Sequence, residues 1–253
     1  MPFPFGQLIL PCRPRRRVFI LGAYPSALHI RWAPPPPHRA IQAIAVDNEP
    51  EPFWDGEDQL IRIEAWQTKV SWQKAWGTAA GTECNGSSGR WVREKVLAPL
   101  KLKNRSEAWI TDCLDTYRFS DGAMGRVEDT YNPFAQVLGL PLVNPDQNPH
   151  PGEDDIVAEA AANQQQRLLS ELNICEPELI VTLGNAALRV IRLFIVSADG
   201  QELPESLAPA GYGNTYNVRI GQRACKWLPL AHPNAPGAYQ DAHAAWIKSR
   251  LGD

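Results

Sequence analysis

Short apolar runs that end at a glycine are the feature that most constrains how this chain can fold. The segment 18–21 (Val-Phe-Ile-Leu) has no polar residue and stops at Gly22, and the segment 179–183 is nearly as apolar and stops at Gly184. Such runs are typical of strands that are buried on both faces of a parallel sheet. Strand-like segments at 108–114 and 225–230 extend the series, and helix-like segments lie between them. The order predicts an α/β protein.

Helical periodicity and hairpin signals fill in this outline. From Glu57 to Trp76 apolar residues recur at steps of three and four, which predicts an amphipathic helix. The segments 215–220 and 225–230 flank Gly221-Gln222 as a hairpin would. We therefore predict a three-layer α/β/α sandwich with a central, mainly parallel four-stranded sheet. Further predicted elements are a strand at 41–46 and helices at 91–97, 154–172 and 236–251.

Two stretches interrupt this regular pattern. The four prolines 34–37 cannot enter a helix or a central strand, so we expect a surface insertion near 33–40. The stretch 117–151 is dense in Pro, Asn, Gly and Asp, and is expected to be long and irregular, as functional loops often are. With 253 residues, the chain is expected to form one domain over 1–253 that carries these two insertions.

Charge and cysteine content narrow the classes of function. With 25 basic and 28 acidic side chains the net charge is −3, which argues against a protein that holds nucleic acid by bulk positive charge. The five cysteines are far apart, so we expect no metal cluster and no cofactor; Cys12 has no nearby mate. No run approaches the ~20 apolar residues of a membrane span, and the first residues make a poor secretory signal. We expect a cytoplasmic monomer. Four arginines form a local basic run that could contact phosphate: Arg13, Arg15, Arg16 and Arg17.

Four loops are expected at the carboxyl ends of the predicted strands, the edge where open α/β sheets bind ligands. These loops are Gly22–Ser26, Thr111–Asp115, Gly184–Asn185 and His232–Gly237.

In chain order these loops resemble the motifs of a known superfamily. Gly22-Ala23-Tyr24-Pro25-Ser26 is similar to a Gly-x-x-Pro-(small or aromatic) loop. The segment 177–187 is similar to a Pro-x-x-Ile-Val-x-Leu-Gly-x-x-Ala junction, and His232-Pro233-Asn234 to a closing His-Pro-Ser motif. Together these segments resemble the uracil-DNA glycosylase superfamily over residues 16–250, apart from the two insertions.

The resemblance implies a DNA-repair hydrolase that extrudes a damaged or deaminated base and cleaves its N-glycosidic bond. Phe53 lies where the superfamily has an aromatic residue that stacks on the base, and Asp112 where it has a pocket Asn. His232 would donate a hydrogen bond to a base carbonyl as negative charge develops there. DNA is the implied partner. The implied substrate-binding residues are Gly22, Ala23, Tyr24, Pro25, Ser26, Phe53, Asn185, Pro233 and Asn234. Pro236 lies in the place of a loop that would wedge into the duplex.

Two departures from the superfamily pattern leave the activity open. An ionised Asp112 only accepts hydrogen bonds. The ionised form would suit a base with an exocyclic amino group. Alternatively, burial keeps the carboxyl group of Asp112 protonated, Asp112 is itself the acid–base group, or it only caps a turn after the strand. Ala23 and Tyr24 stand where active relatives have a carboxylate or an Asn, and Asp47 or Glu49 would either replace it or be solvated loop charges. Catalysis is then slow, altered in substrate, or absent.

Two other functions therefore stay open at this stage. A non-catalytic protein that binds nucleic acid or a modified base is favoured by the missing first-loop carboxylate. A small-molecule or nucleoside hydrolase is favoured by the acidic net charge.

Overall fold

The computed structural model describes residues 15–251, so Cys12 and Arg13 lie outside the described residues. The described residues form two compact units. The first unit comprises 25–90 and 115–150, and the second comprises 15–24, 91–114 and 151–251. The first unit thus consists of two excursions of the chain, and it contains both predicted insertions. The assignment of the chain to one domain stays a prediction.

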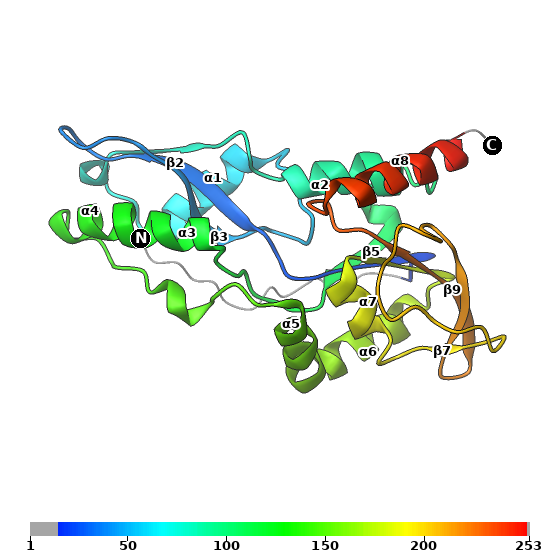
Figure 1. Cartoon of the computed structure of the whole chain (residues 1–253). Coiled ribbons are helices and arrows are strands. Elements are labelled where there is room, and N and C mark those ends of the chain that lie inside the picture. Colours follow the sequence, from blue (N-terminus) through cyan, green and yellow to red (C-terminus); the bar gives the residue numbers. More distant parts are fainter. Residues whose placement is uncertain (1–14, 252–253) are drawn as a thin grey trace. The chain divides into compact units, whose positions relative to one another are not determined.

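The second unit is built on a mixed, mostly parallel sheet of six strands (Figure 1). Four neighbouring strands run parallel, as predicted, but the expectation of a four-stranded sheet is corrected by two antiparallel strands that extend one edge. The predicted hairpin around Gly221 supplies the first of these strands, and the second has two residues, too few for a periodic signal. The sheet order is β5 (Ala108–Asp112), β1 (Val18–Gly22), β6 (Leu179–Leu183), β9 (Arg223–Leu230), β8 (Tyr216–Ile220), β7 (Val196–Ser197).

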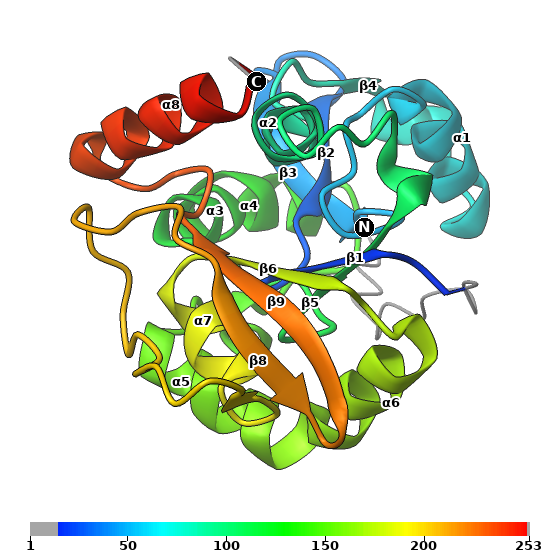
Figure 2. The same cartoon turned by 90° about the vertical axis from the view of Figure 1, so that its right-hand side faces the viewer.

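Helices lie on both faces of this sheet (Figure 2). On one face, residues of α5, α6 and α7 form a hydrophobic cluster with Phe19, Leu21 and Trp227 of the strands. On the other face lies α8, which Figure 2 shows in red. The bounds are α2 (Ser87–Val92), η2 (Arg93–Leu97), η3 (Arg105–Glu107), α5 (Glu153–Glu159), η6 (Ala160–Gln164), α6 (Gln165–Cys175), α7 (Asn185–Ile191) and α8 (Gly237–Leu251).

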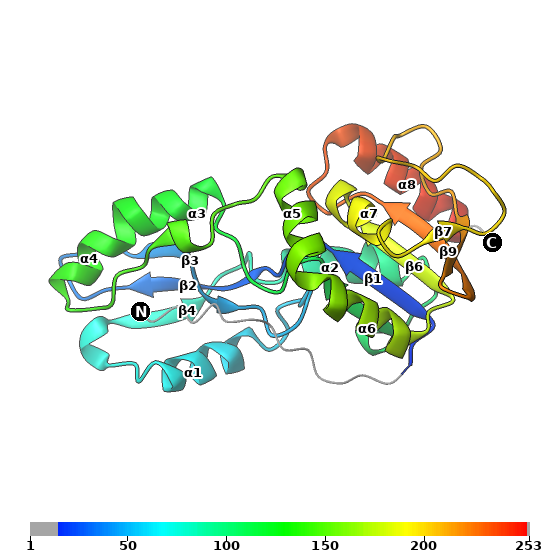
Figure 3. The same cartoon turned by 90° about the horizontal axis from the view of Figure 1, so that it is seen from below.

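The first unit has a small antiparallel sheet in the order β3-β2-β4, with helices packed against it (Figure 3). Its core is rich in large aromatic side chains, among them Trp32, Trp66 and Tyr131. The four prolines lie in the loop between β2 and β3, as expected of a surface excursion. The bounds are β2 (Ala27–Ala33), β3 (Ile41–Asn48), α1 (Gln59–Lys69), η1 (Lys74–Trp76), β4 (Thr78–Gly81), α3 (Asp121–Gly125), η4 (Arg126–Tyr131), α4 (Asn132–Val137) and η5 (Pro145–Gln147).

Two expectations for this unit need correction. The stretch 117–151 is helical from 121 to 137, and it buries Val127, Tyr131 and Ala135 at steps of four. Its Pro, Asn and Gly content hid this periodicity. The predicted helix over 57–76 is shorter than expected, since α1 spans only Gln59–Lys69, and Leu60 is 66% exposed rather than in the core.

Across residues 15–251, no helix is long and apolar enough to cross a membrane.

Candidate functional site

The strand order of the second unit places a switch point between β1 and β6, at the carboxyl ends of its parallel strands. Numbered along the chain, the four parallel strands lie in the order second, first, third, fourth. The chain leaves β1 toward β5 and leaves β6 toward β9, in opposite directions. Ligands of open α/β sheets bind in the crevice that such a reversal opens at the carboxyl ends of the strands. Here those ends are Gly22 and Gly184.

The strand register brings predicted site residues to this edge. Gly22 pairs with Asp112 on the neighbouring strand. On the other side, the Gly184 N–H donates to the Leu230 carbonyl at 2.8 Å, two residues before His232. A Cβ built on Gly184 would lie 3.2 Å from the His232 Cβ. Gly22, Asp112, Gly184 and His232 therefore share one edge of one sheet.

A pocket of about 260 Å³ opens beside His232. Gly184, Asn185 and Asn234 line it, together with Glu153 from the first turn of α5. The Asn185 Oδ1 accepts a hydrogen bond from the Leu207 N–H at 2.8 Å, and the Tyr239 hydroxyl donates to the Leu207 carbonyl at 3.0 Å. Asn185 thus shapes the wall of the pocket.

The hydrogen bonds of His232 indicate its tautomer. The Asn234 N–H donates to the His232 Nδ1 at 3.3 Å, so a neutral ring carries its proton on Nε2. Burial lowers the pKa of His232, which favours the neutral ring at pH 7. His232 is therefore a neutral hydrogen-bond donor in the pocket. Pro233 follows it in a turn that the Ala235 N–H closes on the His232 carbonyl at 2.9 Å.

A partly buried chain of hydrogen bonds holds the backbone just before His232. The Ala231 N–H donates to the Tyr212 hydroxyl oxygen at 2.8 Å, and that hydroxyl lies 2.7 Å from the His243 Nδ1. The His243 Nε2 lies 2.9 Å from the Lys95 carbonyl, which only accepts, so Nε2 carries the proton and Nδ1 accepts from Tyr212. Burial lowers the pKa of His243, in keeping with this neutral tautomer.

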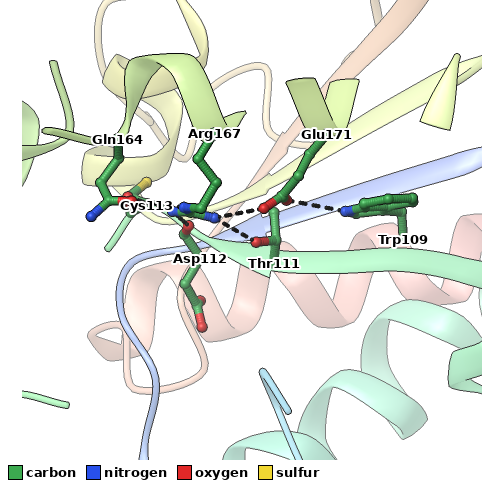
Figure 4. A network of polar contacts seen from close by, with 7 residues as sticks. All are labelled: Trp109, Thr111, Asp112, Cys113, Gln164, Arg167 and Glu171. Atoms are coloured by element: carbon green, nitrogen blue, oxygen red, sulfur yellow. Dashed lines mark hydrogen bonds and ion pairs between the residues drawn. The ribbon is translucent and has the colours of Figure 1, made fainter. Parts of the chain in front are cut away.

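Arg167 of α6 fixes the end of the strand that carries Asp112 (Figure 4). Its Nη2 donates to the carbonyls of Asp112 at 2.8 Å and Cys113 at 3.1 Å. Its Nη1 and Nε donate to three side-chain oxygens, so all five guanidinium N–H groups are used. These acceptors are Thr111 Oγ1 at 3.1 Å, Glu171 Oε1 at 2.9 Å and Gln164 Oε1 at 2.7 Å.

The Asp112 side chain points away from Arg167 in Figure 4 and is 2% exposed. Alternation along β5 explains this direction, because Thr111 faces α6 and its neighbour must face the other side. Burial, followed by the negative charge of Asp112, raises the pKa of the adjacent Cys113 thiol. Asp112 is thus a buried carboxyl group at the sheet edge.

The loop 22–26 divides between the two units. The carbonyls of Gly22 and Ala23 accept from the Cys113 and Leu114 N–H groups at 3.0 Å each, and Tyr24 packs against the core of the second unit. Pro25 and Ser26 belong to the first unit. The roles of these five residues in binding a substrate stay predictions.

Glu49 and Phe53 also belong to the first unit. Glu49 is 3% exposed, and its carboxylate accepts from the backbone N–H groups of Ser26, Phe53 and Trp54 at 2.9–3.2 Å. It clamps the loop that carries Phe53, rather than being a solvated charge. Phe53 is buried with a φ of +54°, and its stacking role stays a prediction. Asp47 forms an ion pair with Lys69 at 2.9 Å.

Sequence reasoning missed Glu153, Arg167 and Tyr212. Arg167 and Glu171 at an i,i+4 spacing on a helix were the one local signal among them. Glu153 looks like an ordinary first-turn acid of a helix, and Tyr212 lies in a Gly-rich loop. For both, the informative neighbour is remote in the chain.

Compared with models of known protein families the chain matches none, and no similar protein is found among the curated proteins.

Proposed function

We propose that this protein is a hydrolase that cleaves the N-glycosidic bond of a damaged or deaminated base in DNA, on a three-layer α/β/α fold like that of the uracil-DNA glycosylase superfamily. The observation that carries the proposal is the pocket beside the switch point. Its lining includes a neutral histidine donor, His232, and an acidic residue, Glu153.

The two groups suit the two charges that this reaction creates. Water attacks C1′ of the sugar while the C1′–N bond breaks, and the base leaves with the bonding electrons. The His232 Nε2–H would stabilise the negative charge on a carbonyl oxygen of the leaving base. A neutral donor fits this role, because it need not give up a full proton. Glu153 would accept the proton of the attacking water, and thus supply the carboxylate that Ala23 and Tyr24 lack.

Asp112 would select the base. Its carboxylate accepts hydrogen bonds, which suits a base with an exocyclic amino group and opposes a uracil carbonyl. Asp112→Asn is therefore expected to shift the preference toward uracil, and an unchanged substrate profile would remove Asp112 from base recognition.

The proposal is tested on duplex and single-stranded oligonucleotides that contain uracil, hypoxanthine, xanthine or an oxidised pyrimidine. Alkali-labile abasic sites are expected with at least one of them. His232→Ala and Glu153→Gln should each lower the single-turnover rate by about 10²-fold or more. Asp154→Asn is the matched control, because Asp154 adjoins Glu153 in the chain but pairs with Arg189 outside the pocket. Its rate should not change.

A second function, binding of nucleic acid without cleavage, is favoured by the first loop, where Ala23 and Tyr24 provide no carboxylate. Binding without abasic sites in the same assay would select this function and reject the hydrolase. If neither form of DNA binds at low salt, both proposals fail, and a small-molecule or nucleoside hydrolase is the function that remains. Phe53→Leu tests the stacking prediction in the same experiment, since loss of a stacked ring should weaken binding by about 1–3 kcal/mol.

A further inference from the structure

A second cavity, of about 690 Å³, lies in the second unit at the opposite end of the sheet from His232. Its floor is the face of β9 that carries Ala224, Lys226 and Leu228 at alternate positions. Arg17 and Glu178, which directly precede β1 and β6, line it at the amino ends of those strands. His232 follows the carboxyl end of β9, so this cavity is separate from the candidate catalytic pocket.

Three cationic residues from three different parts of the chain line this cavity. They are Arg17 before β1, Lys226 on β9 and Arg250 in the last turn of α8. One acid, Glu178, is among the lining residues, and it lies 3.9 Å from Arg17 with both side chains more than 60% exposed. Such an exposed pair is weak. Within residues 15–251, Lys226 and Arg250 form no ion pair.

This gathering of positive charge contrasts with the chain as a whole, whose net charge is −3. Like charges that share a concave surface repel one another and raise the local concentration of anions. An anion that contacts two or three of these cations would relieve the repulsion. Because the cations come from separate elements, the fold itself creates the cluster, rather than a local run of basic residues.

The cavity also has an apolar part. Leu100, Leu179 and Leu228 line it next to the cations. Ligand sites commonly combine such an apolar wall with a few polar groups that fix the orientation of the ligand, within volumes of roughly 300–1,000 Å³. A ligand with an anionic end and a flat or apolar body fits both parts.

We infer that this cavity binds a small phosphorylated molecule, with the phosphate at Arg17, Lys226 and Arg250 and the body against the three leucines. The site is independent of the proposed hydrolase, and a His232→Ala variant should bind the same ligands equally well.

The test uses phenyl phosphate and pyrophosphate as probes, with the full chain and amide NMR at low and at physiological salt. Both probes should shift the Lys226 and Asn217 amides, which face each other across β9 and β8. Phenyl phosphate should bind more tightly than inorganic phosphate, which serves as a third probe, because the leucines contact the ring. The double variant Lys226→Gln/Arg250→Gln should weaken both probes by at least tenfold. Lys248→Gln, which removes a cation from the same turn of α8 outside the cavity, should change binding less than twofold.

Three results would overturn the inference. One is the absence of shifts at Lys226 and Asn217 with either probe. Another is a loss of affinity in Lys248→Gln as large as in the double variant, which would show that the surface charge in general attracts the probes. The third is displacement of phenyl phosphate by a short single-stranded oligonucleotide at a concentration below that of phenyl phosphate, which would assign the cavity to nucleic acid.

Discussion

Gly184 shows how one residue positions the candidate pocket. Its φ of +91° and ψ of 170° lie in a region that only glycine adopts readily. Its missing side chain also allows the turn after β6 to approach the turn after β9, where His232 lies. The same glycine therefore ends the strand, begins α7 and permits the contact with His232.

Gly184→Ala should lower the free energy of unfolding by about 1–3 kcal/mol. An alanine adopts this backbone conformation only with strain, and its Cβ would crowd His232. Urea denaturation measures this change. Gly200→Ala is the control, since Gly200 also has a positive φ of +81° but an added Cβ would have nothing within 4 Å. A loss in Gly200→Ala as large as that in Gly184→Ala would mean that the contact with His232 adds no cost.

Strand β5 shows how one element depends on another. The strand is buried along its whole length, and its last residues are held by Arg167 of α6. Beyond the strand, Cys113 and Leu114 continue the hydrogen bonds to Gly22 and Ala23. A single side chain thus supports the edge where Asp112 and the first loop meet.

Arg167→Met should lower the free energy of unfolding by about 3 kcal/mol, because in a partly buried site it removes the cation that pairs with Glu171, the donor to Glu171 Oε1 and the donor to two carbonyls, although Trp109 Nε1 still donates to Glu171 Oε2. Arg167→Lys should recover only part of the loss, because a lysine keeps the positive charge but lacks the five donors of the guanidinium group. Hydrogen exchange at the Cys113 and Leu114 amides should speed up in both variants. Arg189→Met, which removes an exposed ion pair to Asp154, should cost about 1 kcal/mol or less. A similar cost for Arg167→Met would contradict the role given to Arg167.

Taken as a whole molecule, the chain forms two units, each with its own hydrophobic cluster. Buried or partly buried histidines occur in both. In the first unit, burial and then the charge of Arg126 lower the pKa of His29 to about 4. In the second unit, burial lowers the pKa values of His232 and His243. Folding therefore favours the neutral form of each of these histidines over the protonated form.

Acid should therefore destabilise the protein before its carboxylates titrate. The folded-state pKa of His29 lies below the unfolded value of about 6.5, so the unfolded chain binds a proton first as the pH falls. The contribution of the neutral His29 to the free energy of unfolding is therefore complete above pH 6.5 and is lost as the pH drops toward 4. The loss from His29 is at most about 3 kcal/mol. Urea denaturation from pH 7 to pH 4.5 measures it. His29→Gln should flatten this dependence. An unchanged slope in His29→Gln would contradict the assignment.

The amino-acid sequence by itself determined the local elements. The apolar runs at 18–21 and 179–183, the hairpin at Gly221 and the helix near 237–251 are specified by neighbouring residues, through side-chain periodicity and the freedom of glycine. The sequence also predicted that Asp112 and His232 lie at the carboxyl ends of strands. Tertiary structure decided which groups come together: Glu153 and His232 in one pocket, Arg167 at the end of β5, Tyr212 at Ala231, and three cations in one cavity. These partners lie from about twenty to more than two hundred positions apart, and no local pattern encodes contacts that only the packing of the whole sheet and its helices brings about.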